Sequence, residues 1–103
     1  MIKVSVLYPN DEGSRFDMDY YLGTHIKLVE EKLGDACKEI TVEAGLSGAA
    51  PGSKPPFACA GHMLFDSVEA YQEAFGPHVE TIMGDIPNYT DVEPVVQIGE
   101  VKL

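Results

Sequence analysis

The feature that most constrains the fold is the order in which two kinds of hydrophobic pattern follow one another. Two stretches repeat apolar residues at helical spacing, residues 18–33 and 68–83. Strand patterns occupy residues 2–8, 37–46, 57–65 and 95–101. The order strand, helix, strand, strand, helix, strand predicts a ferredoxin-like α+β fold, in which two helices cover one face of a four-stranded antiparallel sheet.

Capping and breaking residues support these boundaries. Asp17 is a suitable N-cap for the first helix, and Gly34 follows its last apolar residue. Residues 66–69 resemble a capping box that opens the second helix. Gly76-Pro77 is expected to break or kink that helix, because proline cannot donate a backbone hydrogen bond.

The chain has 103 residues, so we expect a single domain over residues 1–103. Two helices can cover only one face of the sheet, and the strands carry apolar residues on both faces. The second face should therefore meet another copy of the chain, which predicts a homodimer.

Charge and composition exclude several partners. The formal net charge is −10, which argues against nucleic acid and against an anionic membrane surface. No apolar run approaches the roughly 20 residues of a membrane-spanning helix, and the start of the chain lacks signal-peptide features. Cys37 and Cys59 have no CxxC spacing, so we expect reduced thiols and a cytoplasmic location.

His25 is the most unusual residue of the first predicted helix. Met18, Leu22, His25 and Val29 fall in one narrow sector of a regular helix, on the face expected to meet the sheet. A neutral imidazole there can accept or donate a proton at a carbonyl or phenol, with Tyr21, one turn earlier, orienting it or sharing a proton. The alternative is a core histidine bonded to a backbone carbonyl or to Tyr21 alone.

Other side chains offer weaker signals. His62, on the third predicted strand, is a candidate ligand-binding residue, and Phe65 and Tyr89 are among the aromatic residues that are candidates for an apolar ligand pocket. Asp85 and Asp91 are interpreted as turn caps. The loop over residues 47–56 is a candidate lid. No histidine pair has metal-ligand spacing and no phosphate-binding loop occurs, so we expect neither a metal nor a nucleotide or flavin cofactor.

Three segments resemble the EthD family, which is named for ethyl tert-butyl ether degradation. They are Tyr20-Tyr21-Leu22-Gly23-Thr24-His25, the segment 61–71 that begins Gly-His-Met-Leu-Phe, and Asp85-Ile86-Pro87-Asn88-Tyr89-Thr90-Asp91. The resemblance implies a dimeric α+β barrel, in which two ferredoxin-like subunits join their sheets. It also implies that the family's helix histidine is His25 and that its tyrosine pair is Tyr20 and Tyr21. Many members have a proline after the histidine, where this chain has Ile26-Lys27-Leu28.

Relatives in that superfamily include cofactor-free monooxygenases, isomerases, polyketide cyclases and heme-handling enzymes. The resemblance therefore implies a cavity between sheet and helices, lined in part by His25, Tyr21 and Tyr20. Two hypotheses follow: a cofactor-independent enzyme in which His25 is a general acid or base on a small apolar oxygenated molecule, and a non-catalytic dimeric protein that binds such a ligand. Heme binding through a histidine is a third hypothesis.

Overall fold

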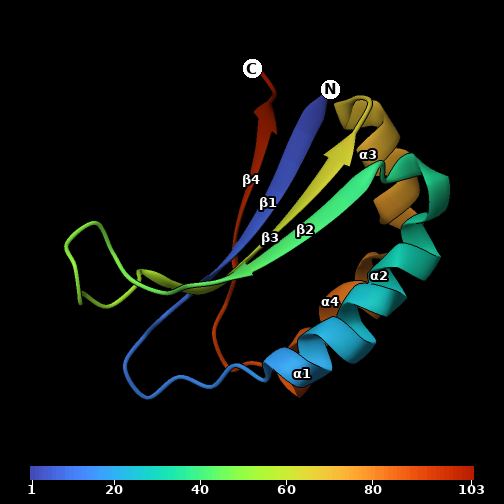
Figure 1. The fold of residues 1–103 in the computed structure, drawn as a ribbon. Coiled ribbons are helices and arrows are strands. Elements are labelled where there is room, and N and C mark those ends of the chain that lie inside the picture. The colour runs from blue at the N-terminus through green and yellow to red at the C-terminus, as the bar shows by residue number, and fades with distance from the viewer.

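A computed structural model describes all residues 1–103 and has the predicted α+β architecture (Figure 1). The four-stranded sheet has the order β2-β3-β1-β4, and every neighbouring pair is antiparallel. The strands are β1 (Ile2–Pro9), β2 (Glu39–Ala44), β3 (Phe57–Phe65) and β4 (Val95–Glu100). The observed β3 has the same bounds as the predicted 57–65 strand. The observed β2 is shorter at both ends than the predicted 37–46 strand.

Both helical regions lie on the same side of the sheet, as Figure 1 shows. The first consists of α1 (Met18–Tyr20), a π-helical turn η1 (Tyr21–His25), α2 (Ile26–Leu33) and the 3-10 turn η2 (Gly34–Ala36). The second consists of α3 (Val68–Phe75), η3 (Gly76–His78) and α4 (Val79–Gly84), with η4 (Ile86–Asn88) after it. The 3-10 turn at Pro77 confirms the predicted break in the second helix.

Local hydrogen bonds explain where the helices begin and end. The Asp17 carboxylate accepts a hydrogen bond from the Tyr20 backbone N–H at 3.0 Å. The Ser67 hydroxyl oxygen accepts one from the Ala70 backbone N–H at 3.1 Å. Gly34 ends α2 with a φ of 57°, a conformation that glycine adopts without a Cβ penalty. All three boundaries were predicted from the sequence.

The π turn corrects one prediction about the helix face. The Ile26 backbone N–H bonds to the Tyr21 carbonyl, five residues earlier, which widens the turn. Tyr21 and His25 are consequently buried together, whereas Leu22 is 46% exposed. The prediction that Leu22 shares the buried face was wrong, because it assumed a regular α-helix through this turn.

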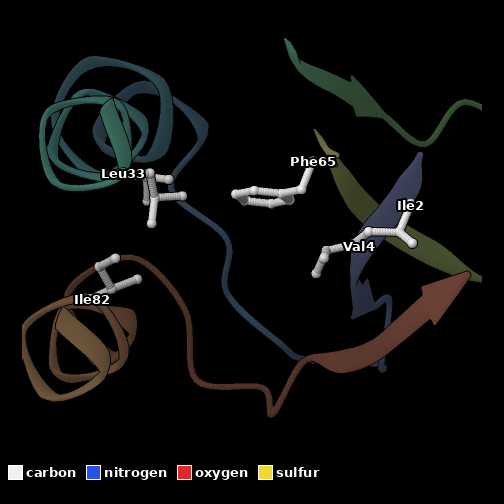
Figure 2. Packing of buried hydrophobic residues seen from close by; sticks show 6 residues of the cluster. Ile2, Val4, Leu33, Phe65 and Ile82 are labelled. Carbon is white, nitrogen blue, oxygen red and sulfur yellow. The ribbon is translucent and has the colours of Figure 1, made fainter. Parts of the chain in front are cut away.

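The main core lies between the sheet and the two helical regions. Figure 2 shows Phe65 of β3 and Val4 of β1 pointing toward Leu33 of α2 and Ile82 of α4. Val29 and Ile2 complete this cluster. Tyr8, Tyr21, Cys59 and Tyr89 form a second buried cluster, and the rings of Tyr21 and Tyr89 lie beside His25.

The sheet face without helices is mixed in character. The alternation of the strands places Leu7, Ala60 and Leu64 on it, together with Ser5 and His62. The Ser5 hydroxyl and the His62 Nδ1 lie 2.9 Å apart, so the central polar pair is hydrogen bonded. No helix of the structure has both the length and the apolar character that crossing a bilayer requires.

Candidate functional site

The His25 imidazole is buried, with only 4% of the residue exposed, and both of its nitrogens face polar side chains. Nδ1 lies 2.9 Å from the Oδ2 atom of Asp85, and Nε2 lies 3.4 Å from the Tyr89 hydroxyl. An ionised carboxylate can only accept, so Nδ1 carries the ring proton and Nε2 keeps a free lone pair. The imidazole is thus held in one tautomer, with its basic nitrogen turned toward the tyrosines.

Asp85 collects three donors at the start of η4. Its Oδ1 atom accepts hydrogen bonds from the Tyr20 hydroxyl at 2.7 Å and the Asn88 side-chain amide at 2.9 Å, while Oδ2 accepts from His25. Burial by itself would raise the pKa of Asp85, but the hydrogen bonds from Tyr20, Asn88 and His25 outweigh it and hold the pKa below its ordinary value. The carboxylate therefore stays ionised at neutral pH.

Burial lowers the pKa of His25, and the hydrogen bond to Asp85 offsets only part of this effect. At neutral pH the imidazole is therefore uncharged. An uncharged imidazole hydrogen bonded to an ionised carboxylate is the resting arrangement of a general base, because the carboxylate stabilises the imidazolium formed when a proton arrives.

Tyrosine hydroxyls continue the network from His25. The Tyr89 hydroxyl is 2.7 Å from the Tyr8 hydroxyl, and both residues are almost completely buried. Burial raises the pKa values of Tyr8, Tyr21 and Tyr89, so all three phenols keep their protons at neutral pH. The Tyr21 hydroxyl reaches the sheet above Gly61, where a Cβ atom would lie only 2.5 Å from it. Glycine at position 61 is what allows this approach.

An apolar cavity of about 150 Å³ lies between the sheet and the helices, and His25 is part of its wall. Fourteen of its 18 lining residues are hydrophobic, and none is a lysine, arginine, aspartate or glutamate. Tyr8, Tyr21 and His25 provide polar groups in the wall. A cavity of this size holds a ring about as large as benzene, and not a porphyrin, so heme does not fit it.

The residues predicted around His25 lie beside it in different ways. The ring of Tyr21 stacks on the imidazole, with centroids 5.5 Å apart and planes inclined by 18°. Tyr20 contacts Asp85 rather than the cavity, and Tyr89 lies behind His25 and does not line the cavity. The alternative prediction was a core histidine hydrogen bonded to a backbone carbonyl or to Tyr21 alone. The hydrogen-bond partners of His25 are instead the side chains of Asp85 and Tyr89.

Three other predicted features lie apart from His25. Phe65 does not line the cavity; it is fully buried in the main core, with its ring 5.1 Å from that of Tyr71. His62 is part of the cavity wall, but its ring nitrogens contact Ser5 and Glu43 because its side chain points to the opposite face. The predicted lid is wrong, since the 47–56 loop lines no part of this cavity and extends away from the helices (Figure 1).

Sequence reasoning missed Asp85 and Asn88 as members of the site, whereas Tyr8 was among the aromatic residues considered for a pocket and does line the cavity. Asp85 was interpreted as a turn cap, and its contact with His25 joins residues 60 positions apart, which no local pattern can reveal. The available signal was the resemblance of the 85–91 segment to a family motif. The described side chains form no group of three or more His, Cys, Asp or Glu residues that could hold a metal ion.

Comparison with known proteins gives a consistent result. The EthD domain family model matches residues 13–93. An EthD-like protein from Ralstonia eutropha is 47% identical, with a TM-score of 0.94, and the alignment covers 99% of this chain and 92% of that one. An ethyl tert-butyl ether degradation family protein from Bacillus halodurans is 21% identical, with a TM-score of 0.69 and 99% of both chains covered.

A third solved structure shows the fold alone. It is a dimeric protein of unknown function with a ferredoxin-like fold from Bacteroides fragilis, 11% identical, with a TM-score of 0.56. The alignment covers 97% of this chain and 94% of that one. A search of curated proteins finds no significant match.

Proposed function

The chain belongs to the EthD family, and from this premise we propose that it is an enzyme in which His25 moves a proton to or from a small apolar oxygenated molecule. One observation carries the proposal: an uncharged imidazole, held by an ionised carboxylate, lies in the wall of an apolar cavity. Proton removal beside a carbonyl, or from a phenol, is the first step of cyclisation, dehydration, isomerisation and substrate-assisted oxygenation.

The hydrogen bonds suggest a route for the proton. Because Asp85 only accepts, Nδ1 of His25 donates to it, and Nε2 is left to accept from Tyr89. Tyr89 in turn accepts from Tyr8, whose side chain is in the cavity wall. The Tyr8 oxygen accepts a proton from the substrate and passes its own proton to Tyr89. Tyr89 in turn passes its proton to Nε2 of His25, so both tyrosines end with their protons and the imidazole gains one.

The same step leaves negative charge on the substrate and positive charge on His25. The electron pair of the broken C–H or O–H bond ends on the substrate oxygen, as an enolate or phenolate. The Tyr21 hydroxyl, also in the cavity wall, can donate to that oxygen, and Asp85 stabilises the imidazolium. Apolar walls strengthen both interactions by excluding water.

Proton abstraction can be tested without knowing the natural substrate. Cyclohexanone is incubated with the protein in deuterium oxide, and NMR follows deuterium incorporation beside the carbonyl. We expect the wild type to accelerate the exchange, and His25→Gln and Tyr8→Phe to lose at least about 10²-fold of that acceleration. His78→Gln, a half-buried histidine outside the cavity, serves as the control.

The exchange assay also separates the two hypotheses about function. A ketone that binds to the wild type without any exchange would favour the non-catalytic ligand-binding protein. Equal exchange by the wild type and His25→Gln would refute the role of His25.

We also propose that the chain forms a homodimer through the helix-free face of the sheet. Leu7 and Leu64, two half-buried residues of this face, offer apolar surface to a partner, and a relative with this fold is described as dimeric. Light scattering should give twice the mass of the chain, and Ala60→Asp should give a monomer by placing an unpaired charge in the interface. A monomeric wild type at micromolar concentration would contradict the proposal.

A further inference from the structure

The exposure of the lining residues shows where the cavity opens to the outside. Most of its lining residues are buried or half-buried, but Met83 and Val96 are exposed. Met83 belongs to α4 and Val96 to the helix-facing side of β4, so the cavity opens between these two elements. The His25 end is enclosed, and the opening is apolar.

An apolar patch continues from this opening along the outside of the molecule. Ile98 follows Val96 on the same side of β4, and Val79 precedes Met83 by one turn of α4. All four residues are between 39% and 49% exposed. Large exposed aliphatic side chains grouped at the mouth of a cavity indicate a surface that a ligand covers.

The cavity wall also limits the charge of that ligand. No cationic side chain lines it, and the charged group that contacts His25 in its wall is the Asp85 carboxylate. A carboxylate or phosphate placed in the cavity would therefore lose its hydration without gaining a counter-ion. Phenols with raised pKa values and an uncharged imidazole suit a neutral oxygen instead.

We propose that the ligand is a neutral molecule with a single six-membered ring, a hydroxyl or carbonyl oxygen at one end and an apolar substituent at the other. The oxygen lies against Tyr8, Tyr21 and His25, and the ring fills the enclosed volume of about 150 Å³. The substituent leaves between α4 and β4 and covers Met83, Val96 and Ile98. This inference rests on the proposed function for the position of the oxygen, and it adds the size, charge and shape of the substrate.

The test is a set of binding titrations by calorimetry with phenol, para-propylphenol and benzoate. Each methylene buried on Met83 and Val96 should strengthen binding about two- to fourfold, so the propyl group should contribute about tenfold or more. Benzoate, which has a similar ring and a negative charge, should bind at least about tenfold more weakly than phenol.

Substitutions on β4 test where the propyl group of the bound para-propylphenol lies. Ile98→Ser should remove much of the gain from the propyl group and leave phenol binding unchanged, because Ile98 is 44% exposed and lies outside the cavity that the ring fills. Val95→Ser is the matched control, since Val95 is 51% exposed on the same strand and points to the opposite face. Light scattering of each variant checks that the oligomeric state is the same.

Four results would overturn the inference: benzoate binding as tightly as phenol, no gain from the propyl group, a gain that Ile98→Ser leaves intact, or failure of both phenols to bind. These results are distinct from failure of the proposed function. If cyclohexanone exchanges its protons at His25 while the phenols do not bind as expected, only the substrate class is wrong. If the phenols bind as expected and no ketone exchanges, the substrate class stands and the catalytic role fails.

Discussion

Asp85→Asn is the substitution that tests most sharply how the site holds its base. It keeps the size and shape of the side chain while replacing an acceptor-only carboxylate with an amide that has both a donor and an acceptor. The His25 side chain is 6% exposed and that of Asp85 is 12% exposed, so solvent screens their interaction little. The amide can donate to Nδ1, and the ring proton is then free to move to Nε2.

The size of the effect follows from the lost interaction. A hydrogen bond to a charged group contributes about 1.5–3 kcal/mol. Since Asp85 raises the pKa of His25 against the effect of burial, its replacement should lower that pKa further. Proton-transfer activity should fall by up to about 10⁴-fold, as occurs when the corresponding change imposes the wrong tautomer on a catalytic histidine.

Nitrogen NMR of isotope-labelled histidine measures both quantities in one titration. The wild type should show His25 protonated at Nδ1, and Asp85→Asn should show a population protonated at Nε2 together with the lower pKa. Asp19→Asn, which changes an exposed carboxylate on α1, should leave both unchanged. An unchanged tautomer and pKa in Asp85→Asn would show that the carboxylate does not control the imidazole.

Two further predictions concern stability. Burial lowers the pKa of His25 from 6.5, so the unfolded chain binds this proton more readily, and the free energy of unfolding should decrease as the pH falls below about 6.5. Urea denaturation should detect this, with a smaller pH dependence in His25→Gln than in His78→Gln; equal dependence would mean that His25 is not held uncharged. Gly61→Ala should destabilise the fold by about 1–3 kcal/mol, because its Cβ would lie 2.5 Å from the Tyr21 hydroxyl. Gly99→Ala, whose Cβ meets nothing within 4 Å, is the control, and equal melting temperatures would contradict the role of Gly61.

The sequence was sufficient for features that depend on neighbouring residues. A short apolar run located the strand Phe57–Phe65. Asp17 and Pro77 marked a helix start and a helix break, because capping and proline geometry act over a single turn. The family resemblance, now supported by a match over residues 13–93, contributed the fold family.

The candidate site was only partly predictable, because its geometry depends on contacts between distant segments. His25 was identified from its place on a helix face, but the partner that fixes its tautomer comes from a segment 60 residues later. The π turn that begins at Tyr21 was not predicted either, because the hydrophobic periodicity was analysed for a regular α-helix. Phe65 was a candidate for the pocket although aromatic residues at such spacings more often belong to the core, which is where the structure places it.

The central claim is that a neutral ligand in the cavity is connected to the basic nitrogen of His25 through the hydroxyls of Tyr8 and Tyr89. The most direct measurement is the nitrogen NMR spectrum of labelled histidine during a titration with phenol. We predict a saturable change at Nε2 of His25, with Nδ1 still protonated toward Asp85 and with His78 unaffected. Saturation of phenol binding with no change at His25 would contradict the claim.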